Sequence, residues 1–184
     1  MDNGASSYRR FLEGDDQGIV EIIRDYKDGL MLYLNSIAEN MELAEEWMEE
    51  TFVKLVTKRP RFSGRSSFKT WLYAIGRNVA LDQLRRHRKI SVTPLDEYES
   101  LAEETDLERE YLQEEEKIQL HRALRELNPD YRQILHLVYF EDFSNAQAAA
   151  ILKKSRRQVE TLLYRARNAL KSQLESEGFL YENL

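Results

Sequence analysis

Two residue types that build reactive sites are scarce in this chain of 184 residues, which has no cysteine and only three histidines. Without cysteine there is no disulfide framework and no thiolate metal site, which fits a reducing compartment. The histidines, His87, His121 and His136, are widely separated in the sequence. There is also no glycine-rich phosphate loop and no Ser/His/Asp set in a suitable context. We therefore expect a protein that is not an enzyme and that needs no metal or cofactor.

Long hydrophobic runs are absent as well. No apolar stretch approaches the roughly 18 to 20 residues that span a bilayer. The first ten residues, MDNGASSYRR, lack the apolar segment of a signal peptide. The sequence therefore predicts a cytoplasmic protein without membrane insertion.

Charge is unevenly distributed along the chain. The formal net charge is -6, yet residues 58–89 hold ten Lys or Arg against one acid, and residues 151–171 hold seven against one. Two cationic segments in an otherwise acidic protein indicate a polyanion that binds at defined places. The alternative is that both segments are simply solvated helix faces.

Apolar periodicity predicts an all-α fold. Helices are expected at residues 16–37, with Asp15 or Asp16 as N-cap, at 41–56, and at about 67–88. The third follows a loop rich in Gly, Ser and Arg at residues 62–67. Trp71 shares its spacing with the core positions of that helix, which favours a core role over base stacking. Phe62 lies outside this spacing and is the better stacking candidate.

Residues 90–116 contain Pro94 and eleven Asp or Glu, with little helical periodicity before Tyr111. This composition is typical of a linker. We therefore expect two small helical domains, residues 1–89 and 117–184, joined by an acidic linker at 90–116.

The second domain is predicted to end in a helix-turn-helix. Helices are expected at residues 117–127, 131–139 and 146–152, and a short turn at 153–155 leads into a longer basic amphipathic helix. In such a pair the second helix enters the major groove of DNA. The turn lacks the glycine often found there, and a purely structural helical hairpin is the alternative.

Together these segments resemble the extracytoplasmic-function (ECF) sigma factors, small two-domain members of the sigma-70 class of bacterial RNA polymerase subunits. LAEEWMEETFVKLV is similar to the region that docks on the polymerase clamp helices. RFSGRSSFKTWLYAIGRNVALDQLRRHRK is similar to the region that melts and reads the minus-10 element. LNPDYRQILHLVYFEDFSNAQAAAILKKSRRQVETLLYRAR is similar to the domain that reads the minus-35 element.

The resemblance implies where single-stranded minus-10 DNA is bound. Phe62 and Asn78 match positions that line the pocket for a flipped base, and the basic side chains would hold phosphates without reading sequence. The expected minus-10 contacts are Phe62, Ser63, Gly64, Arg65, Lys69, Tyr73, Arg77, Asn78, Arg85, Arg86 and Arg88.

The resemblance also implies a minus-35 site on the last helix. The expected contacts with duplex DNA are Ser155, Arg156, Arg157, Gln158, Glu160, Thr161, Tyr164 and Arg165. Glu160 departs from the family pattern. It could accept a hydrogen bond from a cytosine N4 amino group, or it could pair with neighbours such as Arg156 and only orient them.

The expected partners are core RNA polymerase, through its clamp helices and flap, promoter DNA in duplex and single-stranded form, and an anti-sigma factor. Docking on the polymerase is assigned to Glu46, Glu49, Glu50 and Lys54. A helix-turn-helix repressor or activator that does not associate with core polymerase is the alternative function. It would not need a basic aromatic loop and helix suited to open strands.

Overall fold

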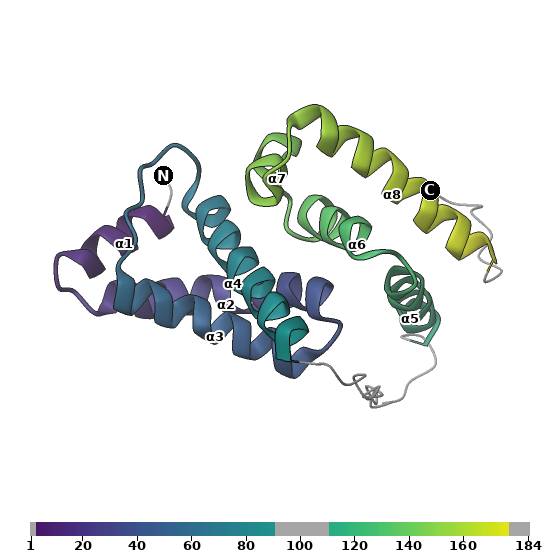
Figure 1. Ribbon diagram of the computed structural model, residues 1–184. Helices are drawn as coiled ribbons and strands as arrows, with labels where there is room; N and C mark the ends of the chain where they lie inside the picture. Colours follow the sequence, from purple (N-terminus) through teal and green to yellow (C-terminus); the bar gives the residue numbers. More distant parts are fainter. Residues whose placement is uncertain (1–2, 91–110, 177–184) are drawn as a thin grey trace.

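The computed structural model describes residues 3–90 and 111–176 of the chain. Most of the predicted linker, residues 91–110, lies outside these ranges. Within them every regular element is helical, and the helices form two neighbouring groups, α1–α4 and α5–α8 (Figure 1). The predicted all-α fold of two helical domains is therefore confirmed. No helix in the described ranges combines the length and the apolar composition that a bilayer crossing requires.

The N-terminal domain consists of α1 (Asn3–Leu12), α2 (Gln17–Ala38), α3 (Met41–Lys58) and α4 (Phe68–Ile90). Its central helix, α2, packs against α1, α3 and α4. Of the two residues expected as N-cap of α2, Asp16 makes no side-chain capping bond, whereas Asp15 Oδ1 accepts from the Gln17 N–H at 3.0 Å. Asn40 caps α3 by accepting from the Leu43 N–H at 3.0 Å.

The C-terminal domain consists of α5 (Tyr111–Arg125), α6 (Pro129–Leu135), the π-helical segment η1 (His136–Phe140), α7 (Asn145–Leu152) and α8 (Arg156–Ser176). The long helix α8 packs on α5, α6 and α7. The sequence predicts one helix over 131–139, whereas the α-helix ends at Leu135 and a π-helical turn follows.

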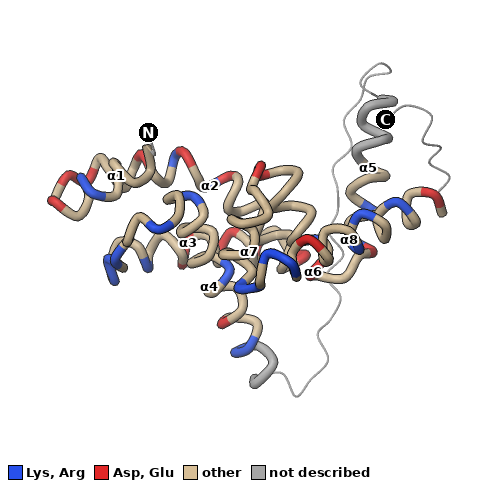
Figure 2. Tube along the Cα trace, turned by 90° about the horizontal axis from the view of Figure 1, so that it is seen from above, with Lys and Arg blue, Asp and Glu red and all other residues tan. Residues whose placement is uncertain are grey.

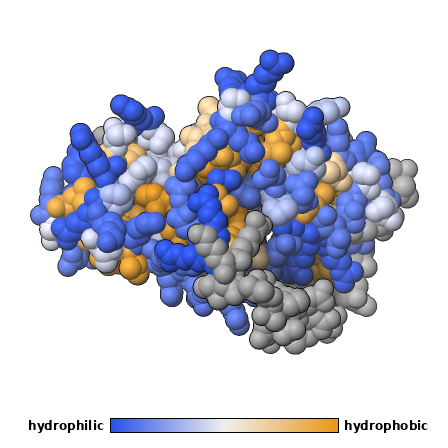
Figure 3. All heavy atoms as spheres, viewed as in Figure 1, coloured by the Kyte–Doolittle hydropathy of each residue, from blue (hydrophilic) through white to orange (hydrophobic). Residues whose placement is uncertain are grey.

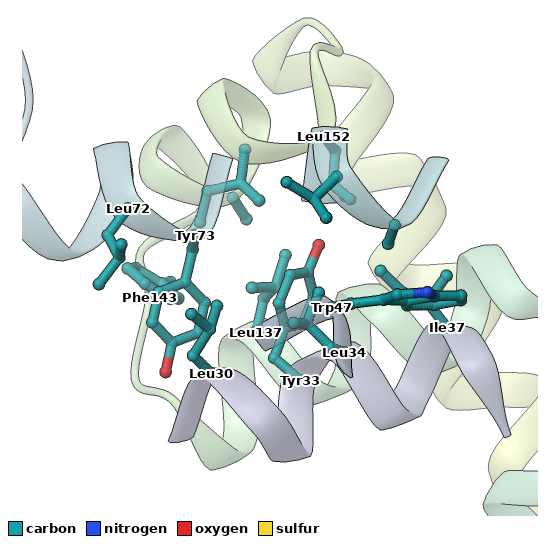
Figure 4. Packing of buried hydrophobic residues seen from close by; sticks show 14 of the residues in the cluster. Leu30, Tyr33, Leu34, Ile37, Trp47, Leu72, Tyr73, Leu137, Phe143 and Leu152 are labelled. Atoms are coloured by element: carbon teal, nitrogen blue, oxygen red, sulfur yellow. The ribbon is translucent and has the colours of Figure 1, made fainter. Parts of the chain in front are cut away.

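The two domains share one apolar core. Helix α7 packs on α4, and α6 and η1 pack on α2. Figure 4 shows Leu72 and Tyr73 of the N-terminal domain beside Phe143, and Leu137 beside Tyr33 and Leu34. These side chains are between 0% and 4% exposed. On the face seen in Figure 3, hydrophilic side chains dominate and apolar ones form separate small patches.

Candidate nucleic-acid interface

The loop at residues 59–67 begins where α3 is stopped by a left-handed residue. Arg59 has φ 44° and donates its N–H to the Leu55 carbonyl at 3.2 Å, after which Pro60 cannot continue the helix. Gly64 has φ 71°, and a Cβ there would meet nothing within 4 Å. The tip of the loop, Ser63, Gly64 and Arg65, is therefore exposed and free to approach a ligand.

Phe62 lies on a shelf of aromatic rings. Its ring centre is 5.2 Å from that of Trp71 and 5.7 Å from that of Phe68, and its own side chain is partly buried. Trp71 packs against the core cluster with Phe68, which agrees with the core role favoured by its spacing. Phe68 is fully buried, whereas Phe62 and Trp71 are both partly buried.

Helix α4 carries the other expected minus-10 contacts on two different faces. Ser67 caps the helix by accepting from the Thr70 N–H at 3.2 Å. Asn78 is partly buried, and Arg85 and Arg86 are exposed near the far end. The Arg88 side chain lies outside the described part. Figure 2 shows Lys and Arg at the loop before α4, along α4 and on α8.

Three of the expected contacts lie on the side of α4 that meets the C-terminal domain, and two of them, Tyr73 and Arg77, are buried there. Tyr73 is 1% exposed and Arg77 is 9% exposed. Arg77 Nε donates to Gln133 Oε1 at 3.1 Å. Lys69 Nζ lies 2.8 Å from Glu141 Oε2 and 4.9 Å from the Phe143 ring centre. The sequence predicts these side chains on an open face, whereas in the structure they form the contact between the two domains.

Glu141 is the centre of this contact. Its carboxylate accepts from the Tyr73 hydroxyl at 2.7 Å and pairs with Lys69. It also lies over Gly29 of α2, where a Cβ would come within 2.9 Å of Oε1 and 2.6 Å of the Tyr73 hydroxyl. Burial would raise the pKa of Glu141, but interactions with His136, Lys69 and Tyr73 outweigh it and lower the pKa to about 2.

A second link between the domains is formed by Arg132 of α6, whose side chain is 7% exposed. Its Nη1 lies 2.7 Å from Glu39 Oε1, and its Nε donates to the Ser36 carbonyl at 3.2 Å, both at the end of α2. The same guanidinium donates to the carbonyls of Arg125 and Leu127. One side chain therefore ties the end of α5 and the end of α2 to α6.

The helix-turn-helix predicted at the C-terminal end is formed by α7 and α8. Ser144 begins α7 with a capping box that it shares with Gln147. The turn has no glycine, and Lys153 takes the left-handed conformation there with φ 54°. Ser155 then caps α8 by accepting from the Gln158 N–H at 3.2 Å, and Gln158 Oε1 accepts from the Ser155 N–H at 2.7 Å. This second capping box, signalled by the spacing Ser-x-x-Gln, gives Gln158 a structural role that the sequence reasoning missed.

The outer face of α8 presents the remaining expected minus-35 contacts to solvent. Arg156, Arg157, Glu160, Thr161, Tyr164 and Arg165 are all exposed, Tyr164 at 61%. Arg156 Nε donates to Glu160 Oε1 at 3.0 Å, so the pairing that was one of the two alternatives for Glu160 is present. Both side chains are largely exposed, and an exposed pair of this kind is weak enough to exchange for a base contact.

The expected docking residues lie on α3. Glu46 and Glu49 are exposed, and Lys54 is partly buried. Glu50 is partly buried and accepts a hydrogen bond from Gln83 of α4. The acidic face is therefore available to a basic partner, with Glu50 also fastening α3 to α4.

Helix α1 is an element that the sequence reasoning missed. Its Tyr8 and Phe11 are buried against the N-terminal domain, and Tyr8 packs on Phe68 and Trp71 with ring centres 5.6 and 5.3 Å apart. Its buried positions 4, 7, 8 and 11 have helical spacing, but two of them are Gly4 and Ser7, which are not core-forming residue types. In the described ranges, no group of three or more acidic or histidine side chains is placed to hold a metal ion.

Two family models match the chain. Residues 22–90 match Sigma-70 region 2, and residues 117–170 match Sigma-70, region 4. RNA polymerase sigma factor YlaC of Bacillus subtilis (strain 168) is 32% identical over 158 residues, which cover 85% of this chain and 91% of YlaC. ECF RNA polymerase sigma factor SigM of the same organism is 29% identical, over 84% of this chain and 93% of SigM.

The chain is also similar to solved structures. The sigma factor RpoE of Bartonella quintana, in a co-crystal structure with the anti-sigma factor NepR, matches with a TM-score of 0.65 and 25% identity. The match covers 84% of this chain and 95% of RpoE. CnrH, in complex with the cytosolic domain of CnrY, matches with the same TM-score of 0.65 over 95% of this chain and 96% of CnrH. At 20% identity this second likeness shows the fold alone.

Proposed function

The chain belongs to the sigma-70 family, and within it to the ECF sigma factors. We propose that one of its two cationic faces binds the minus-10 element of the promoter and the other binds the minus-35 element. As a sigma factor the protein binds core RNA polymerase and directs promoter-specific transcription, and its region 4 reads the minus-35 element. Sigma factors are initiation factors and not enzymes. We place the protein in the cytoplasm with the polymerase.

Recognition of the minus-35 duplex is assigned to the exposed side chains at the start of α8. Arg156 and Arg157 stand in the first turn of a recognition helix, where Arg reads guanine edges in the major groove. Lys154 and Arg165 border the same face and suit phosphate contacts. The observation that carries this assignment is the exposure of Arg156, Arg157, Tyr164 and Arg165 along α8.

Capture of the opened minus-10 strand is assigned to the loop at 59–67 and to α4. Phe62 offers a ring for stacking, Asn78 an amide for a base edge, and Arg65, Arg85 and Arg86 phosphate contacts. Lys69, Tyr73 and Arg77 join this set only when the C-terminal domain leaves α4, because in the described arrangement they hold that domain. The two domains must therefore separate before the full minus-10 face can bind DNA.

Docking on core polymerase is assigned to the exposed face of α3. Glu46 and Glu49 provide acidic groups for a basic surface on the clamp helices, and Lys54 lies farther along the same helix. A repressor or activator without core polymerase is the weaker candidate, because region 2 would then have no use.

An anti-sigma partner is expected from the likeness to RpoE, which was solved with one. A groove of about 440 Å³ lies between α2, α5 and η1. Its walls include the apolar side chains of Leu32, Met41 and Phe140, and Arg125 and His121 stand beside them. This composition suits an amphipathic helix with acidic side chains.

The function is tested by transcription of a random promoter library with purified core polymerase, with and without the protein, followed by sequencing of the start sites. The expected result is a set of new start sites that share minus-35 and minus-10 elements. Failure to bind core polymerase, or the absence of any new start site, would overturn the proposal. The library also supplies the promoter that the later experiments need.

A further inference from the structure

Helix α1 precedes the segment that matches region 2, which begins at residue 22, yet it contacts the loop of that region. Tyr8 donates a hydrogen bond from its hydroxyl to the Pro60 carbonyl at 2.7 Å. The Arg59 guanidinium lies 5.1 Å from the ring centre of Phe11, also on α1. The first two residues after α3 are therefore both held by α1.

The same tyrosine supports the shelf on which Phe62 lies. The ring of Tyr8 packs on Phe68 and Trp71, and Phe62 packs on the same two rings. Tyr8 is 1% exposed, and burial raises its pKa to about 12, so its hydroxyl keeps the proton that it donates. One side chain thus fixes both the backbone at the start of the loop and the surface beneath the proposed stacking ring.

The packing leaves α1 little freedom to move away. A Cβ at Gly4 would lie 2.4 Å from Phe68 Cδ1, so the first turn of α1 sits directly on the core of α4. Ser7, the neighbour of Tyr8, donates to Glu21 Oε2 of α2 at 2.7 Å. Helix α1 is therefore fastened to α2 by Ser7 and to the loop by Tyr8.

We propose that Tyr8 is a positioning residue for strand capture: through Pro60 and the aromatic shelf it holds the loop at 59–67 so that Phe62 and the exposed tip face the opened strand. The inference rests on the proposed role of this loop in minus-10 binding. Tyr8 itself is buried and touches no DNA. By restraining the free loop, it lowers the conformational entropy that the loop loses when the strand binds.

The test compares Tyr8→Phe with Ser7→Ala, because each removes one hydroxyl donor from α1 and only the first of these donors contacts the loop. Polymerase carrying each variant is titrated with a fork-junction DNA that exposes the selected minus-10 strand. Tyr8→Phe is expected to weaken binding about three- to tenfold, the value of one hydrogen bond. Ser7→Ala is expected to leave binding unchanged, and affinity for core polymerase should be the same for both. Equal DNA affinities for the two variants would overturn the proposal.

Loop order is measured directly in the free protein with a spin label. The chain has no cysteine, so Ser63→Cys provides a single labelling site at the exposed loop tip. The label is expected to become more mobile with Tyr8→Phe and to stay unchanged with Ser7→Ala. An unchanged spectrum in Tyr8→Phe contradicts the positioning role. If wild-type polymerase itself fails to prefer the fork-junction DNA, the proposed minus-10 function fails instead.

Discussion

The Tyr73 hydroxyl donates to the Glu141 carboxylate across the boundary between the two helical domains, with 2.7 Å between Oη and Oε2. Lys69 pairs with the same carboxylate, so two expected DNA contacts on α4 are bound to one acid of the C-terminal domain. In the proposed minus-10 site, DNA phosphates would therefore compete with the Glu141 carboxylate for Lys69. On this proposal, closure of the domains and full exposure of the minus-10 face exclude one another.

Replacing Glu141 should loosen this contact. Glu141→Lys places a cation beside Lys69 and leaves the Tyr73 hydroxyl without its acceptor. The Lys69 side chain is 35% exposed, so breaking this pair costs less than breaking a fully buried one, but the loss of the pair and of the Tyr73 hydrogen bond should shift the equilibrium toward separated domains. Fluorophores on Lys27→Cys and Arg167→Cys, two exposed positions in different domains, should report lower energy transfer than in the parent protein.

Asp142→Asn is the matched control for this experiment. Asp142 is the exposed neighbour of Glu141 and has φ 56°, a conformation that Asn adopts readily. Its replacement should leave energy transfer unchanged. Equal energy transfer in Glu141→Lys and the parent would show that the carboxylate does not hold the domains together.

Acid should open the same contact. The pKa of Glu141 is lowered from about 4.5 to about 2, so the ionised form is favoured in the folded state. Its contribution is complete at neutral pH and is lost as the pH falls from about 4.5 toward 2; the shift corresponds to roughly 3 kcal/mol. The difference in unfolding free energy between wild type and Glu141→Gln should shrink over this range. A difference that stays constant from pH 7 to pH 3 would contradict the assignment.

The positions of single helices could be predicted from the sequence because they depend on local signals, namely apolar periodicity and capping residues. The stripe of apolar residues predicts α3 to within two residues at its C-terminal end, and Ser144 marks the start of α7 by its side chain. The exposed face of α8 follows from the same periodicity. The features that could not be predicted depend on contacts between residues that are far apart in the sequence.

Tyr73 and Arg77 illustrate this limit. Their polar character places them on the open face of an amphipathic helix, and only the docking of α6 and α7 buries them with Gln133 and Glu141 as partners. Helix α1 was missed because Tyr8 and Phe11 are too few to give a periodic signal, although both are buried once α2 and α4 are in place. Lys153 adopts the left-handed backbone conformation that glycine usually adopts at the end of a helix. Helix and turn propensities do not predict a lysine at such a position.

Glu160 should influence base preference and not stability. Its pair with Arg156 is exposed, so Glu160→Gln should change the free energy of unfolding by less than about 0.5 kcal/mol. If Glu160 accepts from a cytosine or orients Arg156 toward a base, discrimination at one minus-35 position should change by about 1–3 kcal/mol. Selection from the promoter library measures this directly.

Glu175→Gln provides the matched control, because Glu175 also pairs four residues along α8 with a basic residue, Lys171, at 3.7 Å. It lies near the end of the helix, away from the proposed recognition turns. Its replacement should leave the selected minus-35 sequence unchanged. An identical base profile for Glu160→Gln and wild type would remove Glu160 as a determinant of specificity.

The acidic face of α3 should govern affinity for core polymerase. Glu49→Lys reverses an exposed charge that makes no ion pair within the described ranges, so thermal stability should change little. Repulsion from a basic clamp surface should lower the association rate and weaken binding about tenfold, with a steeper effect at low salt. Fluorescence anisotropy of labelled protein with core polymerase measures both. Glu13→Lys, an exposed acid beyond the end of α1, should leave binding unchanged, and equal losses in the two variants would point to net charge instead of a docking site.

Phe62 and Asn78 should affect opening of the promoter after polymerase has already bound. Phe62→Ala removes the proposed stacking ring, and stacking is worth about 1–3 kcal/mol per base, while Asn78→Ala removes the amide proposed to read a base edge. Both should shorten the lifetime of open complexes, measured by permanganate footprinting, while affinity for core polymerase and for the minus-35 duplex stays at the wild-type value. Phe140→Ala, a half-exposed phenylalanine of the C-terminal domain, should have no such effect. If Phe62→Ala and Asn78→Ala lose core binding in the same proportion as open complexes, the defect lies in folding, and strand capture must be assigned to other residues of the loop and α4.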